Sequence, residues 1–302
     1  MYKDFSEMFA AAKAGKRRTV SVAAAAEEHI IRLVTEIKKE DLCDIVLVDD
    51  EGKIREIAER LGESLAGVSV IHEPAPDKVA LHAVSLVSAG KADVLIKGNI
   101  NTSDFCRAIL DKEQGLRTGR RLSALTCYDV PSMKKLFFIT DGGMNIAPDL
   151  EAKADILRNA VEVIHNLGVR LPKVALLSAN EKVSPRMQSS VDAQMLCEMA
   201  SRGELPDAIY EGPIAFDVAM RPDAAETKGI KSRISGDVDL FLVPNIETGN
   251  CLGKSIGFFG HGQAAVLLVG ARKPAVMTSR SASVKSKLMA TAFALLSCDE
   301  EQ

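Results

Sequence analysis

The sequence has little that would direct it to a membrane or to nucleic acid. No apolar run approaches the ~20 residues that a membrane-spanning helix requires. Residues 1–18 contain acidic side chains and lack the apolar core of a signal peptide. The 38 basic and 41 acidic residues are interspersed and give a net charge of −3, so there is no basic patch for nucleic acid or a lipid surface. We therefore predict a cytoplasmic protein that binds neither a membrane nor nucleic acid.

Paired cysteines are also lacking. The six cysteines include no C-x-x-C motif, and none has a histidine beside it at the spacing of a metal site. The five histidines are equally dispersed, so a metal site would have to be assembled by tertiary structure alone. We expect reduced, mostly structural thiols and no bound metal.

What the sequence does contain is an alternation of short apolar segments with amphipathic helical ones. After the first predicted strand, Ile30, Leu33, Val34 and Ile37 form a stripe with helical spacing. This alternation is typical of a parallel sheet covered by helices. We predict a helix capped by Asp77, a long helix that begins at Asp149, a turn at 211–213 and an irregular surface segment at 220–236. The predicted strands are 18–24, 45–48, 68–71, 92–96, 124–128, 136–139, 174–177, 209–210, 238–243, 265–269 and 275–278, and a hairpin-like segment through Pro131 joins 124–128 to 136–139.

The segment 238–255 predicts a strand, a loop and a helix that begins near Asn250. Gly249 would let the turn approach a ligand closely, and the N–H groups at the helix start would favour an anion. The ATP-binding P-loop is excluded, because only three residues separate Gly249 from Gly253 and Thr248 stands where its first glycine should be. A phosphate site of another kind and an ordinary turn both stay open.

Two other predicted strand ends carry polar donors. Lys97 is followed by Asn101, Thr102 and Ser103, which could donate to an anion, although Thr102 or Ser103 could equally be a helix N-cap. Three arginines further along the chain, Arg117, Arg120 and Arg121, are more typical of a solvated loop than of a ligand site.

Ser279 and Arg280 lie between the last predicted strand and the last helix. Open α/β sheets bind ligands at this position. An arginine there could hold a phosphate with two parallel hydrogen bonds, or could form a structural ion pair. Together the three strand ends predict a cleft that binds phosphate.

Ordered motifs resemble the phosphate acetyltransferase and phosphate butyryltransferase family over essentially the whole chain. They are KADVLIKGNINTSDFCRAIL, GLRTGRRLS, ITDGGMNIAPDL, DAQML, EGPIAFDVAM, PNIETGN and PAVMTSR. The chain looks closer to the butyryl branch, because DKEQGLRTGR and PNIETGN are of that type and the longer insertion expected before Ala92 in acetyltransferases is missing. The resemblance implies reversible conversion of acyl-CoA, preferably butyryl-CoA, and inorganic phosphate to acyl phosphate and CoA.

The resemblance also implies an architecture. It predicts a two-domain α/β/α fold similar to isocitrate and isopropylmalate dehydrogenases, with the active site in the cleft between domains. One domain would comprise residues 1–121 plus 268–302, and the other residues 122–267. No cofactor is implied, since the CoA thioester is a substrate, and the expected assembly is a homodimer or larger homo-oligomer.

Site residues carry over from the family one by one. Arg280 corresponds to the arginine near the phosphate and the reacting carbonyl, Ser279 to the serine beside it, and Arg107 to a second substrate-binding arginine. The further predicted phosphate and CoA ligands are Lys97, Thr102, Asn245, Thr248, Gly249 and Asn250. Acetyltransferases have an aspartate at the position of Ser286, so the base for the CoA thiol is unassigned, and the thiolate would depend on Arg280, Arg107 and Lys97.

Three alternatives stay open. One is a phosphate acetyltransferase acting mainly on acetyl-CoA. Another is a non-catalytic module that binds CoA or phosphate. A nucleotide-dependent dehydrogenase of the same fold is disfavoured, because no G-x-G-x-x-G follows the first strand and no aspartate cluster suits a divalent metal. The acyl preference would depend on residues such as Met144, Ile146, Ile214 and Phe216, which the sequence does not rank.

Overall fold

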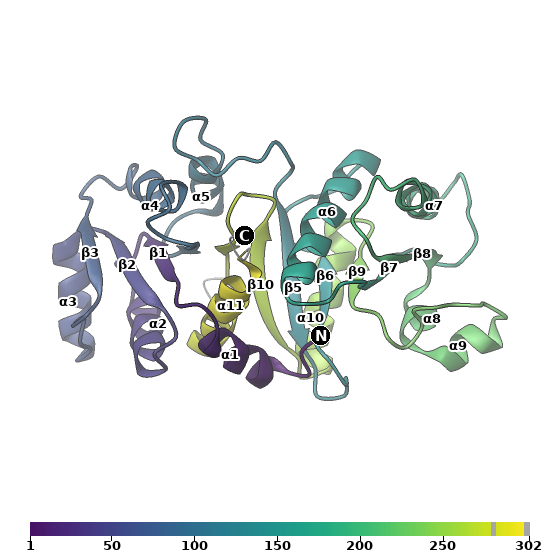
Figure 1. Cartoon of the computed structure of the whole chain (residues 1–302), viewed down its shortest axis with the longest axis horizontal. Helices are drawn as coiled ribbons and strands as arrows, with labels where there is room; N and C mark the ends of the chain where they lie inside the picture. Colours follow the sequence, from purple (N-terminus) through teal and green to yellow (C-terminus); the bar gives the residue numbers. More distant parts are fainter. Residues whose placement is uncertain (279–281, 299–302) are drawn as a thin grey trace. The chain divides into compact units, whose positions relative to one another are not determined.

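The computed structural model describes residues 1–278 and 282–298. It has a mixed α/β fold, which confirms the predicted class, and it divides into two compact units (Figure 1). Unit 1 consists of Met1–Asp4 and Arg121–Ala264, and unit 2 of Phe5–Arg120 and Ala265–Gln302. No described helix combines the length and the apolar character that crossing a membrane would demand.

The sheet of unit 2 has the strand order β3-β2-β1-β4-β11-β10. Neighbours from β3 to β11 run parallel, whereas β10 and β11 are antiparallel. The short apolar segments therefore form a parallel sheet with one reversed strand beside β11. The strands are β1 (Thr19–Ala23), β2 (Asp44–Asp49), β3 (Ser69–His72), β4 (Val94–Lys97), β10 (Gln263–Val269) and β11 (Ala275–Val276).

Helices of unit 2 form two groups. In one, α11 (Val284–Ser297) contacts α1 (Phe5–Ala14) and α2 (Glu28–Lys39), and α2 contacts α3 (Glu51–Leu61). In the other, α4 (Val79–Ser88) packs on β1, β2 and β4 and contacts α5 (Thr102–Ile109). The apolar stripe predicted for α2 is buried, which confirms that this face of the helix packs inward.

The sheet of unit 1 has the strand order β5-β6-β9-β7-β8. The first pair is antiparallel, as the predicted hairpin requires, and the remaining pairs are parallel. Its strands are β5 (Ser123–Asp129), β6 (Phe137–Thr140), β7 (Lys173–Leu177), β8 (Ile209–Ile214) and β9 (Leu240–Leu242). Its helices are α6 (Leu150–Asn166), α7 (Gln188–Ser201), α8 (Phe216–Met220), α9 (Pro222–Thr227) and α10 (Ile246–Phe259).

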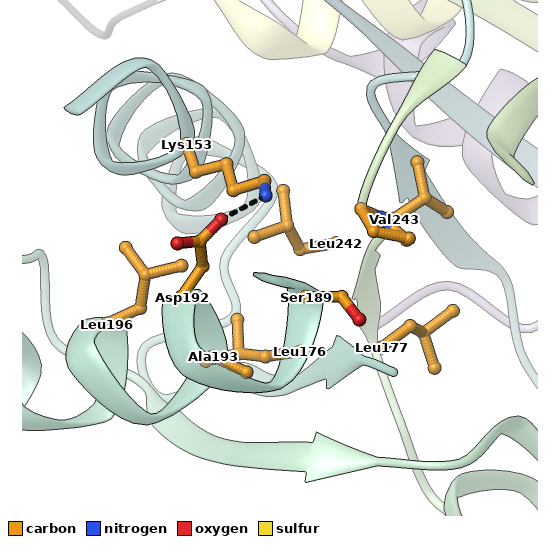
Figure 2. Close-up of a pocket in the computed structure, with 10 residues that line it drawn as sticks. Lys153, Leu176, Leu177, Ser189, Asp192, Ala193, Leu196, Leu242 and Val243 are labelled. Atoms are coloured by element: carbon orange, nitrogen blue, oxygen red, sulfur yellow. Dashed lines mark hydrogen bonds and ion pairs between the residues drawn. The ribbon is translucent and has the colours of Figure 1, made fainter. Parts of the chain in front are cut away.

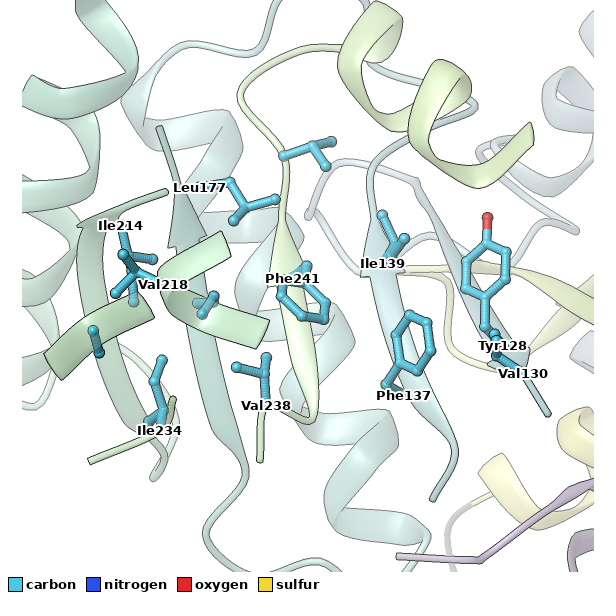
Figure 3. Packing of buried hydrophobic residues seen from close by; sticks show 14 residues of the cluster. Tyr128, Val130, Phe137, Ile139, Leu177, Ile214, Val218, Ile234, Val238 and Phe241 are labelled. Atoms are coloured by element: carbon cyan, nitrogen blue, oxygen red, sulfur yellow. The ribbon is translucent and has the colours of Figure 1, made fainter. Parts of the chain in front are cut away.

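A core of aromatic and branched side chains fills one face of this sheet (Figure 3). The ring of Phe137 stacks on Tyr128 and meets the ring of Phe241 edge-on, with centroids 5.6 and 5.9 Å apart. Val218 of α8 and Ala225 of α9 close the cluster.

Several sequence predictions were wrong in detail. The segment 220–236 is irregular only in part: Pro222 starts the short helix α9, residues 228–236 form no helix or strand, and Ile234 is buried in the core. The short strand at 209–210 continues to Ile214, since a bulge on this edge strand accommodates Pro213. Helix α1 was not predicted at all, although Phe5, Met8 and Ala12 bury one face of it.

The predicted cap at Asp77 was also wrong. Helix α4 begins at Val79, and its flanking residue Lys78 makes no side-chain capping bond. The N–H of Lys78 donates to the carbonyl of Ala75 at 2.9 Å, so a backbone turn already encloses Asp77 before the helix starts.

Candidate functional site

Three neighbouring parallel strands of unit 2 end at the same edge. Ala23 at the end of β1 pairs with Lys97 at the end of β4, and Val276 at the end of β11 pairs with Ile96. The segments that follow these strands therefore lie beside one another at the carboxyl edge of the sheet, where α/β proteins bind ligands.

The turn after β4 passes very close to the turn after β1. The N–H groups of Gly98 and Asn99 donate to the carbonyls of Ala23 and Ala24, each at 2.8 Å. A Cβ on residue 98 would lie 2.1 Å from the Ala24 oxygen, so only glycine fits. Ala24 itself has a φ of 57°, a left-handed conformation that is uncommon for alanine. This contact holds Lys97 and Asn99 at the edge of the sheet.

A pocket of about 240 Å³ opens at this edge. We call it the lysine pocket, because Lys97 and Lys287 line it and are only 8% and 5% exposed. Burial lowers the pKa of Lys287, and the nearby Glu27 carboxylate partly opposes that shift. Its lining residues are Glu27, His29, Ile30, Lys97, Gly98, Asn99, Thr278 and Lys287.

Local hydrogen bonds hold the side chains of Glu27 and Lys287, which lie at the starts of two helices beside this pocket. The Glu27 carboxylate accepts from the N–H of Ile30 at 3.1 Å and so caps α2. The Lys287 ammonium lies in the first turn of α11 and donates to the carbonyl of Ala282 at 2.9 Å. The pocket thus presents ammonium donors and one carboxylate from defined positions.

The other predicted residues of unit 2 occupy different positions. Thr102 is the first residue of α5, and Asn101, rather than Thr102 or Ser103, takes the N-cap position. Arg107 is on the exposed side of the same helix and pairs with Asp104 at 2.7 Å. Neither Thr102 nor Arg107 lines the lysine pocket. Ser279 and Arg280 lie outside the described residues, immediately after Thr278.

In unit 1 the predicted helix begins earlier than expected. Helix α10 starts at Ile246, not near Asn250, because the Asn245 side chain caps it. The Asn245 Oδ1 accepts from the Thr248 N–H at 3.0 Å and from the Thr248 hydroxyl at 2.6 Å. Asn250 is therefore exposed within the helix, and the N–H groups of the helix start belong to residues 246–248.

Gly249 lies within helix α10 rather than in the predicted turn. It is buried in the first turns of α10, and a Cβ there would lie 2.6 Å from Gly142 Cα and 2.9 Å from Val243 Cγ2. Its lack of a side chain lets the helix contact the loop after β6. Close approach of a ligand at Gly249 stays a prediction.

That loop is organised by a buried carboxylate. The Asp141 side chain is 2% exposed and accepts from the N–H groups of Gly143 at 2.8 Å and Met144 at 2.9 Å. It also accepts from the side-chain amide of Asn145 at 2.6 Å. The carbonyl of Ile146 then accepts from the N–H of Ile246 at 2.9 Å, which joins the loop to the start of α10.

Asn245 lines a pocket of about 690 Å³ within unit 1, which we call the Asn245 pocket. A buried ion pair lies in its wall: Lys153 Nζ is 2.5 Å from Asp192 Oδ2, and the two side chains are 6% and 5% exposed. Figure 2 shows this ion pair in the wall of a second pocket, which shares Lys153, Ser189 and Asp192 with the Asn245 pocket. Gln188 donates to the other carboxylate oxygen at 2.7 Å. The lining residues are Ala147, Pro148, Asp149, Leu150, Lys153, Gln188, Ser189, Asp192, Met195, Pro244 and Asn245.

Sequence reasoning missed four charged residues of these pockets: Glu27, Lys153, Asp192 and Lys287. A signal was present for Lys153, which lies one helical turn before Leu157 on the buried face of α6. Charge on an apolar helical stripe marks a buried polar group. Within residues 1–278 and 282–298, no cluster of three or more histidine, cysteine or acidic side chains could hold a metal ion.

Comparisons with known proteins agree on one family. The family model described as "Phosphate acetyl/butaryl transferase" matches residues 70–295. The phosphate butyryltransferase of Clostridium acetobutylicum is 39% identical over 98% of this chain and 98% of its own length. The crystal structure of a branched-chain phosphotransacylase from Enterococcus faecalis V583 is 35% identical, covers 93% of this chain and 98% of its own, and has a TM-score of 0.82.

A more distant likeness concerns the fold alone. A 4-hydroxythreonine-4-phosphate dehydrogenase from Klebsiella pneumoniae is 13% identical, with a TM-score of 0.63 over 93% of this chain and 100% of its own. The predicted similarity to dehydrogenase folds is confirmed at this level.

Proposed function

Because this chain belongs to the phosphate acetyl/butyryltransferase family, we propose that it transfers a short acyl group, butyryl by preference, between CoA and inorganic phosphate. It is an acyltransferase enzyme. The observation that supports phosphate as the acceptor is the lysine pocket, where the buried Lys97 lies at the carboxyl ends of β1, β4 and β11 beside Thr278. The preference for butyryl rests on the relative from Clostridium acetobutylicum.

The reaction we propose is a direct attack within a ternary complex. A phosphate oxygen forms a bond to the thioester carbonyl carbon, and the carbon–sulfur bond breaks to release the CoA thiolate. Negative charge grows on the carbonyl oxygen and then on sulfur, so fixed cations and donors stabilise the transition state. Holding both substrates in the right orientation supplies much of the remaining acceleration without a covalent intermediate.

We assign the leading roles to Arg280 and Ser279. Arg280 would neutralise phosphate and the developing oxyanion, and Ser279 would donate a hydrogen bond beside it. Lys97 and Thr102 would hold phosphate or CoA, with Arg107 exchanging its Asp104 partner for a substrate phosphate. We expect the enzyme to act in the cytoplasm as a homodimer or larger homo-oligomer.

The start of α10 is the proposed recognition element of unit 1. Asn245, Thr248 and Asn250 would offer polar groups to CoA or phosphate, and Gly249 would contribute by keeping this helix against the loop at Gly142. Thr248 and Asn250 are exposed, so a substrate can reach both.

The test measures loss of thioester absorbance with butyryl-CoA and acetyl-CoA, with and without phosphate. Thioester absorbance is preferable to a thiol reagent, because Cys251 is exposed and would react with it. The wild type should require phosphate and prefer butyryl-CoA, and Arg280→Ala should lose at least ~100-fold in kcat, as when one oxyanion donor is removed. Lys285→Ala, an exposed charge on α11, serves as the matched control and should stay active.

Other outcomes identify the alternatives. Faster turnover of acetyl-CoA would favour a phosphate acetyltransferase. Thioester loss that ignores phosphate would contradict acyl transfer to phosphate, and CoA binding without turnover would favour a non-catalytic module. Initial rates with both substrates varied should give intersecting lines, whereas parallel lines would indicate a covalent acyl-enzyme.

A further inference from the structure

Lys287 is a buried ammonium that the proposed reaction does not yet use. It is 5% exposed and enters the lysine pocket from α11, while Lys97 enters from the end of β4. The Lys287 ammonium donates to the carbonyl of Ala282 at 2.9 Å, and an ammonium carries three N–H donors. Two such lysines at one small pocket concentrate positive charge on whatever the pocket binds.

We propose that Lys287 and Lys97 together bind the phosphoryl group of inorganic phosphate, with the Glu27 carboxylate accepting a hydrogen bond from the O–H that inorganic phosphate retains. This inference rests on the proposed function and names the substrate group that this pocket holds. It adds Lys287 and Glu27 to the substrate-binding residues.

The size of the pocket selects the phosphoryl group rather than the bulk of CoA. Its volume of about 240 Å³ is large enough for a tetrahedral oxyanion. Pockets that bury larger ligands usually occupy roughly 300–1,000 Å³. The Asn245 and Thr248 segment belongs to unit 1 and is not part of this pocket.

The carboxylate makes the pocket more specific than a simple positive patch. Glu27 is held in place by its cap on Ile30, and an ionised carboxylate can only accept hydrogen bonds. Near neutral pH inorganic phosphate still carries a proton that it can donate to such an acceptor. Sulfate has none, so it would meet Glu27 as one anion facing another.

The decisive measurement compares the KM for phosphate with the KM for acyl-CoA in Lys287→Met. We expect the KM for phosphate to rise roughly 10- to 100-fold, the loss typical of one charged hydrogen bond, with little change for acyl-CoA. Lys285→Met removes a charge from the exposed side of the same helix and should leave both constants unchanged. An unchanged KM for phosphate in an active, folded Lys287→Met would overturn the inference.

The pH profile of Lys287→Arg gives an independent readout. Since burial lowers the Lys287 pKa, its charge is present below that pKa and is lost as the pH rises through it. Phosphate affinity in the wild type should therefore fall on the alkaline side. Arginine stays charged, so the fall should be weaker in Lys287→Arg, although Glu27, His29 and Lys97 also face this pocket. Identical alkaline limbs would contradict the assignment.

Glu27→Gln tests the same inference without touching either lysine. Glutamine keeps an oxygen to cap α2 and adds an N–H donor. Sulfate should compete weakly with phosphate in the wild type and roughly 10-fold more strongly in Glu27→Gln. Equal competition by sulfate in both proteins would refute the role of the carboxylate.

An error in the proposed function and an error in the pocket assignment would give different results. If the proposed function is wrong, the wild type itself shows no phosphate-dependent thioester loss. If only the pocket assignment is wrong, the wild type is active and the Lys287 and Glu27 variants keep its phosphate KM and its response to sulfate. Phosphate should also raise the melting temperature of the wild type more than that of Lys287→Met, which checks binding apart from turnover.

Discussion

Replacing Gly249 by alanine should destabilise the protein, even though alanine is the better helix former. The new Cβ would lie 2.6 Å from Gly142 Cα and 2.9 Å from Val243 Cγ2, and the first of these atoms is backbone. Overpacking of this kind costs about 1–3 kcal/mol, and the short backbone contact places Gly249→Ala at about 3. The gain in helix propensity returns about 1 kcal/mol, which leaves a net loss of about 2 kcal/mol.

Helix α10 contains its own control. A Cβ on Gly257 would meet nothing closer than the carbonyl oxygen of Gly262 at 3.9 Å. Gly257→Ala should therefore gain roughly 0.5–1 kcal/mol from helix propensity alone. Because the two changes are chemically identical and lie in one helix, the sign of the difference isolates the contact with Gly142.

Urea unfolding followed by circular dichroism measures both variants against the wild type. The midpoint should fall for Gly249→Ala and rise slightly for Gly257→Ala. Gly249→Ala should also raise the KM for CoA substrates, since the Asn245 cap would be displaced together with the helix start. A midpoint for Gly249→Ala at or above that of the wild type would refute the close-packing explanation.

Three further predictions concern buried charges and thiols. Lys153→Met or Asp192→Asn alone should lower the free energy of unfolding in urea by about 3–5 kcal/mol, because each leaves an unpaired buried charge. The double change Lys153→Met with Asp192→Leu should recover most of that loss. Asp141→Ala removes the acceptor for the N–H groups of Gly143 and Met144, so it should lower the free energy of unfolding by about 1–3 kcal/mol or more. It should also raise the KM for CoA. An unaltered KM would show that this loop does not contribute to CoA binding. A thiol reagent should label Cys251 before Cys43, whose burial raises its pKa to about 12, and peptide mapping that finds Cys43 first would contradict the described exposure.

The sequence predicted those parts of the fold that depend on local pattern. The stripe on α2, the hairpin between β5 and β6, and the Asp149 cap of α6 all follow from spacing or from one capping residue. It failed where tertiary pairing overrode a local signal. Pro213 was typical of a turn, yet an edge strand tolerates it. No pattern in the segment 220–236 indicated that Ile234 would be buried in the core.

The site was predictable as a set of strand ends but not as a set of pockets. Lys97 was predicted because it follows an apolar strand, and Asn245 was predicted from the family resemblance. Lys287 and Glu27 were missed, since each belongs to a helix start far along the chain from Lys97, and only the pairing of β1, β4 and β11 brings them to one pocket. The contact of Gly249 with Gly142 was not predicted, because the two residues are remote in sequence.

The cap on α10 has a consequence for the polarity of recognition. Because the Asn245 oxygen accepts from Thr248, the half of that amide which can face a substrate is its hydrogen-bearing nitrogen. A group bound there must bring an oxygen, as a phosphate or a carbonyl does. Aspartate caps a helix equally well but has no such hydrogen. With aspartate at position 245 the helix would still begin at Ile246, but its start would repel an anion instead of attracting one.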